Sequence, residues 1–197
     1  YLMQSFYGSV IQLSFIELSP LLSILFFGVW FLGISNAVNL LDGVDGLAGS
    51  VMCILLLALA GIGYLHSIAA FFWINIFLMV CILPFLWFNF YPAKLYMGDS
   101  GSLFLGYYLA VVPFLFHSFV QHVSVSFLPF VILCLYLVID TLRVMFGRLC
   151  RGHHPFVADH THGHHVMLRL FKTPIKVVAC ICLFNGLCSV AVVLFGF

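Results

Sequence analysis

Four long stretches of this 197-residue chain contain no Asp, Glu, Lys or Arg. They cover residues 18–41, 46–93, 100–139 and 177–197, and they are 24, 48, 40 and 21 residues long. One helical crossing of a bilayer takes about 20 apolar residues, so these stretches have room for one, two, two and one crossings. The sequence therefore predicts an all-α fold, that of a polytopic integral membrane protein with about six transmembrane helices.

The composition excludes two large classes of protein. Apolar residues make up 64% of the chain and charged residues 7%, whereas a soluble domain carries about 25% charged residues. Seven basic and six acidic side chains are too few to build a water-soluble surface. The formal net charge of +1 offers no basic patch, so we expect no nucleic-acid partner. The partner that this composition requires is the lipid bilayer.

We expect the six helices at about residues 18–38, 48–65, 69–88, 103–120, 125–147 and 174–196. They make residues 1–197 a single transmembrane domain. The first seventeen residues end at Glu17 and are interpreted as the tail of an earlier span or as an interfacial segment. The chain begins with Tyr1 and shows no signal peptide, so we interpret it as a fragment of a larger protein.

All charged side chains except Glu17 fall in or next to three connections between the predicted helices, at about residues 39–47, 89–102 and 148–173. Eight of them lie between Asp140 and Lys176. Two spans separate each connection from the next, so all three should lie on one side of the membrane. All seven Lys and Arg residues lie on that side, and the positive-inside rule makes it cytoplasmic. Because ionisable groups next to a bilayer are costly, their convergence predicts a functional site at this face.

The first connection contains Asn36, Asn39, Asp42 and Asp45, one at every third position. Each such step drifts by about 60° around a helix, so neighbouring pairs can share a face but all four cannot. We expect a helix that ends at Asp42 and opens into a tight Asp-Gly turn. Capping of a helix at a membrane exit is the alternative, and it accounts for one or two of these residues.

The second connection ends in Gly98-Asp-Ser-Gly101, which we expect to open the next helix. A helix N-terminus favours a bound anion. Asp99 would repel a phosphate there unless a divalent cation bridged them, and Mg²⁺ typically takes one or two carboxylates together with substrate phosphates. The alternative for Asp99 is helix capping. The alternative for Tyr96 is an interfacial tyrosine.

The third connection holds six of the nine His residues, at positions 153, 154, 160, 162, 164 and 165. Together with Arg148 and Arg151 they suit a phosphate-rich ligand. Zinc is the alternative, although the spacing is not that of a closed structural site. Asp140 and Arg143, three residues apart near the end of the fifth predicted helix, are interpreted as a structural ion pair.

Three motifs, Asn36–Leu47, Tyr96–Ser102 and Asp159–His165, resemble in sequence and order those of the polyprenyl-phosphate N-acetylhexosamine-1-phosphate transferases, glycosyltransferase family 4. Members are bacterial inner-membrane enzymes that move a sugar-1-phosphate from a UDP-amino sugar to undecaprenyl phosphate and release UMP. The resemblance implies that the chain belongs to a ten- or eleven-span enzyme with its site on the cytoplasmic face. The resemblance is also compatible with a homodimer.

The resemblance also implies roles for individual residues. Catalytic roles fall to Asp42, Asp45, Asp99, His162, His164 and His165. Substrate-binding roles fall to Asn36, Asn39, Asn89, Tyr96, Arg148 and Arg151. Asp99 would be the ligand of Mg²⁺, with Mn²⁺ as a substitute.

Details of the third connection favour one branch of the family. Residues 148–159 resemble the basic stretch of the branch that uses UDP-GlcNAc and starts O-antigen or other surface glycans. Gly163 interrupts the His run, whereas the phospho-MurNAc-pentapeptide translocase branch has three adjacent His. We therefore expect UDP-GlcNAc, with phospho-MurNAc-pentapeptide transfer as the alternative.

One departure from the family pattern concerns an adjacent Asp-Asp pair, which the family carries on an earlier cytoplasmic loop and this chain lacks. We therefore expect the 197 residues alone to be inactive. Two other classes stay open: a membrane metal transporter, which would line a path with mid-membrane acidic residues, and a structural membrane protein, which needs no polar convergence.

Overall fold

The computed structural model describes residues 12–13, 16–17, 19–120, 126–152 and 162–195. The helices in this part of the chain are α2 (Pro20–Leu41), α3 (Leu47–Leu65), α4 (Ala69–Asn89), α5 (Gly98–Phe119), α6 (Leu128–Leu133), α7 (Leu135–Cys150), α8 (Gly163–Phe171) and α9 (Pro174–Phe195). Two strands of two residues each, β1 (Gln12–Leu13) and β2 (Ile16–Glu17), pair antiparallel before α2. This strand pair was not predicted, and the rest of the described chain follows the all-α expectation.

Five of the helices are long and apolar enough to cross a membrane: Leu21–Leu41 within α2, then α3, α4, α5 and α9. Their most apolar windows have a mean hydropathy between 1.5 and 2.6. Each lies within a few residues of its predicted position. The structure therefore confirms a polytopic membrane protein and the place of these spans.

The helix predicted at about 125–147 differs from the expectation. It is broken into α6 and α7 at Cys134, which ends the first helix and begins the second. Cys134 donates its N–H to the carbonyl of Phe130 at 3.1 Å, and its own carbonyl accepts from the N–H of Val138 at 2.9 Å, so hydrogen bonds of helical spacing are kept on both sides of the break. No Gly or Pro lies at the break, and nothing in the local sequence explains it.

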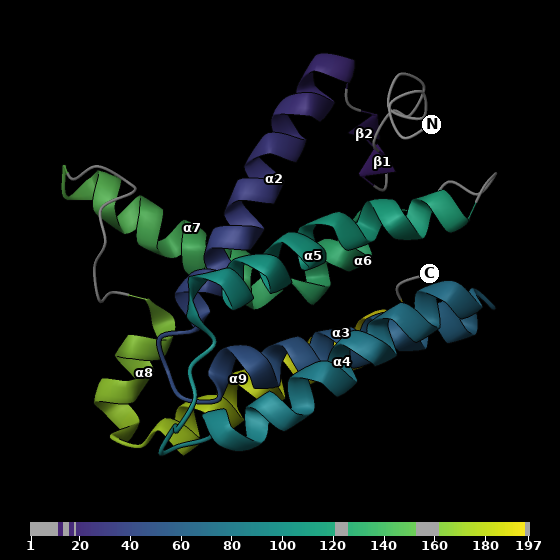
Figure 1. The fold of residues 1–197 in the computed structure, drawn as a ribbon. Coiled ribbons are helices and arrows are strands. Elements are labelled where there is room, and N and C mark those ends of the chain that lie inside the picture. Colours follow the sequence, from purple (N-terminus) through teal and green to yellow (C-terminus); the bar gives the residue numbers. More distant parts are fainter. Residues whose placement is uncertain (1–11, 14–15, 18, 121–125, 153–161, 196–197) are drawn as a thin grey trace.

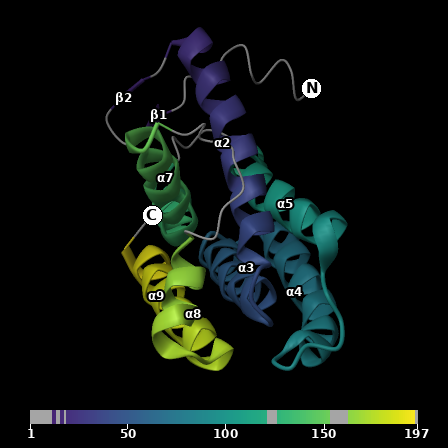
Figure 2. The same cartoon turned by 90° about the vertical axis from the view of Figure 1, so that its left-hand side faces the viewer.

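Two groups of helices make up the bundle (Figure 1). In one group α3 packs against both α4 and α9, and in the other α2 packs against α5 and α7. Helix α3 is the most buried span, with Val51, Met52, Leu55 and Leu59 fully enclosed. Short helix α8 packs on α9, and Figure 2 shows it below α7 and beside α9.

The contact between α2 and α5 depends on a residue without a side chain. A Cβ at Gly106 would lie 2.7 Å from Cα and 2.8 Å from the carbonyl oxygen of Ser35. The two backbones therefore approach as closely as helices with small residues at their interface do in membranes. One turn further along α5, the carbonyl of Ala110 accepts the indole N–H of Trp30 at 3.1 Å. This close packing sets the end of α2 beside the start of α5.

We predict that Gly106→Ala destabilises the protein. The added methyl group overlaps backbone rather than a movable side chain, and overpacking of this kind costs about 1–3 kcal/mol. Gly33→Ala in α2 is the control, because no atom lies within 4 Å of its added Cβ. Thermal unfolding in detergent should show a lower Tm for Gly106→Ala alone. Equal Tm values for the two variants would contradict the close contact.

Candidate active site

Side-chain hydrogen bonds to backbone groups join the first and second polar connections. Asn89, buried at the end of α4, accepts from the N–H of Gly46 at 3.1 Å and donates to the carbonyl of Leu95 at 2.8 Å. The carboxylate of Asp45 accepts from the N–H of Ala93 at 3.0 Å. Asn89 and Asp45, both predicted site residues, therefore hold the two connections together.

Asn39 joins α2 to the first turns of α5. Its amide nitrogen lies 3.1 Å from Oδ1 of Asp99 and 2.8 Å from Oγ of Ser102. The hydroxyl of Ser102 donates to the carbonyl of Gly98 at 3.0 Å, and the N–H of Gly98 bonds to the carboxylate of Asp42. The structure thus brings Asn39, Asp42 and Asp99 together from two motifs that are 60 residues apart along the chain.

The carboxylates of Asp42 and Asp99 lie close enough to interact. Partial burial raises the pKa of Asp42, the hydrogen bond from Gly98 opposes that rise, and the negative charge of Asp99 adds to it. Asp99 lies exposed in the first turn of α5, and the helix begins after Met97 without a side-chain cap. The side chain of Asp99 therefore does not cap the helix. Its negative charge next to that of Asp42 favours a bound cation.

The donor set of this place suits a hard cation. Carboxylate and amide oxygens are the ligands that Mg²⁺ prefers, and Mg²⁺ usually completes its shell with water or substrate phosphates. Within the described residues no three His, Cys, Asp or Glu side chains gather closely enough to hold a metal by themselves. Asp42 and Asp99 therefore fit as two of the ligands of a magnesium ion, which would need further ligands to complete its shell.

The histidines of α8 approach the first connection. His164 is buried, and its burial, followed by the charge of neighbouring His165, lowers its pKa to about 4, so its imidazole is neutral at pH 7. The two rings lie 4.3 Å apart between centroids. A Cβ at Gly43 would be 3.2 Å from Nε2 of His164 and 3.5 Å from Cε1 of His165. The predicted convergence of the third connection with the first is confirmed for these residues.

Asp140 anchors the beginning of α8 on α7. Its carboxylate accepts from Arg143 at 2.8 Å, which confirms the predicted ion pair. It also bonds to Nδ1 of His162 at 2.9 Å and to the N–H of Gly163 at 2.7 Å. Sequence reasoning missed these two contacts, because nothing in the pattern links Asp140 to a histidine 22 residues further along.

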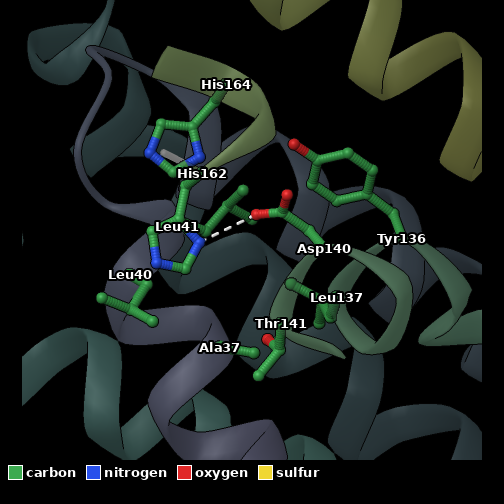
Figure 3. A pocket seen from close by; sticks show the side chains of 9 residues that line it. All are labelled: Ala37, Leu40, Leu41, Tyr136, Leu137, Asp140, Thr141, His162 and His164. Carbon is green, nitrogen blue, oxygen red and sulfur yellow. Dashed lines mark hydrogen bonds and ion pairs between the residues drawn. The ribbon is translucent and has the colours of Figure 1, made fainter. Parts of the chain in front are cut away.

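A small cavity lies between α2, α7 and α8 (Figure 3). Its volume is about 10 Å³, close to that of one water molecule. Asp140, Tyr136, Thr141, His162 and His164 supply its polar lining, and Ala37, Leu40, Leu41 and Leu137 the apolar part. The cavity is too small for a substrate.

Four predicted substrate-binding residues lie either at the end of α7 or at exposed positions. Arg148 and Arg151 lie at the end of α7, which extends away from α8 in Figure 1. Arg151 donates to the carbonyl of Gly147 in its own helix at 2.8 Å. Asn36 and Tyr96 are exposed, Tyr96 to 70%. Their roles stay predictions, and residues 153–161 of the His-rich segment lie outside the described residues.

Comparison with known proteins identifies the family. A model of the family described as glycosyl transferase family 4 matches residues 2–117, which carry the first and second polar connections. The chain belongs to this family.

Relatives with two different names match the chain. A Bacillus subtilis protein named probable undecaprenyl-phosphate N-acetylglucosaminyl 1-phosphate transferase is 33% identical over 141 residues, 71% of this chain and 39% of the relative. The phospho-N-acetylmuramoyl-pentapeptide-transferase of Staphylococcus saprophyticus is 37% identical over 142 residues, which are 71% of this chain and 42% of the relative. The protein of the same name from Lactococcus lactis is 45% identical over 94 residues, which are 48% of this chain and 29% of the relative. This chain spans at most about two fifths of the length of these relatives.

We predict that Asn89→Ala loosens this family 4 site. The change leaves the N–H of Gly46 and the carbonyl of Leu95 without their partner, and a buried unpaired group costs about 1–3 kcal/mol. Hydrogen exchange should speed up at residues 43–47 and 93–97. Ser100→Ala, at an exposed position nearby, is the control. Unchanged exchange in both variants would show that Asn89 does not hold the connections.

Proposed function

We propose that the protein transfers an N-acetylhexosamine-1-phosphate from a UDP-sugar to undecaprenyl phosphate and releases UMP. The observation that carries this proposal is the gathering of Asn39, Asp42 and Asp99 opposite the His motif of α8, at one end of a membrane-embedded bundle. Family membership and the names of the relatives support it. Both substrates are polyanions, one of them anchored in lipid, which matches a polar site at a membrane face.

The residues of the chain have separable tasks in this reaction. Asn39 holds the carboxylate of Asp99 in place, while Asp45 and Asn89 keep the second connection against the first. The imidazoles of His164 and His165 can donate N–H groups to phosphate oxygens. Transfer of a phosphoryl group depends mainly on positioning and electrostatics. Mg²⁺ or Mn²⁺, held by Asp99 with Asp42, would supply neutralisation of the diphosphate charge.

GlcNAc-1-phosphate is the group that we propose for transfer. Gly163 between His162 and His164 supports this choice, because it breaks the run of adjacent histidines. Phospho-MurNAc-pentapeptide is the alternative, and relatives of both names resemble the chain. We place the site on the cytoplasmic face of a bacterial inner membrane, where UDP-sugars are found, and the positive-inside distribution of Lys and Arg supports that orientation.

Release of UMP tests the function directly. Because we expect the 197 residues alone to be inactive, the test joins them to an upstream segment that carries the Asp-Asp pair. Membranes that contain this completed protein should release UMP only when UDP-GlcNAc, undecaprenyl phosphate and Mg²⁺ are all present. Replacing UDP-GlcNAc by UDP-MurNAc-pentapeptide separates the two sugars. Absence of UMP with either donor, from completed protein shown to be folded by its helical circular dichroism, would reject the proposal.

We predict that Asp99→Asn lowers turnover by about 100-fold or more. The substitution keeps the shape of the side chain and its contact with Asn39 but removes a negative ligand, and loss of metal-based charge stabilisation costs several kcal/mol. UMP release as a function of Mg²⁺ concentration measures the effect, with Ser100→Ala as the matched control. Turnover near that of the control would defeat the assignment of Asp99.

We predict that Tyr96→Phe is mild and that Tyr96→Ala weakens binding of the UDP-sugar. An aromatic ring survives only the first change, and stacking of a base on a ring is worth about 1–3 kcal/mol. Calorimetric titration with UDP-GlcNAc gives the two affinities. If both variants bind alike, Tyr96 is an ordinary interfacial tyrosine.

A further inference from the structure

The side chain of Asp140 is surrounded by donors. Oδ1 lies 2.8 Å from Nη2 of Arg143 and 2.7 Å from the backbone nitrogen of Gly163, and Oδ2 lies 2.9 Å from Nδ1 of His162. The side chain of Asp140 is 10% exposed and that of His162 5% exposed. An ionised carboxylate can only accept hydrogen bonds, and the two donors on Oδ1 keep this carboxylate ionised.

These contacts determine which ring nitrogen of His162 carries the proton. Because Oδ2 of Asp140 can only accept, Nδ1 of His162 must be the protonated nitrogen. The second ring nitrogen, Nε2, is buried and has no hydrogen-bond partner among the residues that the structure describes. A second proton there would place a buried N–H without an acceptor, which is unfavourable. The neutral ring therefore has a bare Nε2.

We propose that Asp140 is a positioning residue: it fixes His162 as the tautomer protonated at Nδ1, with Nε2 as a bare nitrogen that accepts a hydrogen bond. The ligand that this nitrogen takes is a single water molecule in the cavity that His162 lines, since the cavity has room for no more. This proposal rests on the proposed function, because it fixes the residue from which the remaining histidines of the motif, His164 and His165, extend toward the proposed substrate site.

The backbone of Gly163 belongs to the same arrangement. A Cβ at this residue would lie 3.0 Å from Oδ1 of Asp140 and 3.3 Å from the hydroxyl of Tyr136. A side chain at position 163 would therefore push the carboxylate away from the N–H that it binds. The glycine that interrupts the His run is what lets Asp140 hold both His162 and the first residue of α8.

Other groups around His162 do not replace Asp140 in this task. Helix α7 contributes Tyr136 and Arg143, of which the first is a weak acid and the second a donor only. Helix α8 contributes His164, whose ring is stacked with that of His162 at 5.8 Å between centroids. The residues of α2 that line the cavity are apolar. Asp140 supplies the acceptor that bonds to Nδ1.

Nitrogen NMR of the ¹⁵N-histidine-labelled protein in nanodiscs tests the proposal without any activity. The signal of His162 is identified by its loss in His162→Gln. In the unchanged protein we expect a protonated Nδ1 and a bare Nε2. A proton on Nε2 with a bare Nδ1 would overturn the proposal, whatever reaction the protein catalyses.

Asp140→Asn is the informative variant. If its amide oxygen stays with the two donors, Gly163 and Arg143, its NH₂ group faces His162 and can only donate, so the proton of His162 should move to Nε2. Arg143→Gln is the matched control, since it removes the ion pair and leaves the bond to His162, and the tautomer should be unchanged. Asp140→Glu should restore the original tautomer. An unchanged tautomer in Asp140→Asn would overturn the proposal.

Activity gives an independent readout. Asp140→Asn should lower kcat on the order of 10- to 100-fold, the loss typical when the partner that orients a functional histidine is removed. KM for the UDP-sugar should change little, because the Asn39 and Asp99 contacts lie on other helices. These rates are measured on the protein completed with the upstream segment. A switched tautomer with unchanged kcat would reject the functional role of His162, and a completed protein with no activity at all would reject the proposed function instead.

Discussion

Polar groups in the interior of a membrane protein must find partners within the protein, because the bilayer core offers no water. Asn75, in the middle of α4, shows how this chain meets the requirement. Its amide donates to the carbonyl of Phe71 at 2.7 Å and accepts from the hydroxyl of Tyr108 in α5 at 2.9 Å. The same requirement governs the turns at the polar end, where Asn89 pairs the backbone groups of both connections.

The acidic side chains differ in what their surroundings leave them to do. Asp45 accepts from a backbone N–H of the facing connection, and Asp140 is surrounded by donors. Asp42 and Asp99 instead lie close enough for the charge of one to raise the pKa of the other. Two carboxylates that repel each other at a membrane face are the part of the site best suited to a cation and the phosphates that it accompanies.

Much of the fold was predictable because the bilayer leaves a strong signal in the sequence. Uncharged stretches located the five long spans. Parity placed the three polar connections at one end only because it also counted the predicted helix at 125–147, which forms as α6 and α7. The break at Cys134 was not predictable, since no Gly or Pro marks it. The short strands before α2 were likewise missed, because two-residue pairing depends on contacts and not on periodicity.

The sequence predicted which residues form the site, but not which groups they bind. Motif spacing pointed to Asn39, Asp42 and Asp99, which the structure joins. It could not reveal that Asn89 and Asp45 bind backbone, or that Asp140 holds His162, because these contacts depend on how α4, α7 and α8 pack in space.

A shared active site requires all three polar connections to lie on one face of the membrane. Single cysteines at Gly43, Lys94 and Thr173, all exposed, mark these connections, and Ser118 marks the other end of α5. The seven native cysteines are replaced beforehand. In intact cells an impermeant thiol reagent should label only the Ser118→Cys protein, and the other three should react after the membrane is opened. Labelling of any of the three from outside would contradict a shared site.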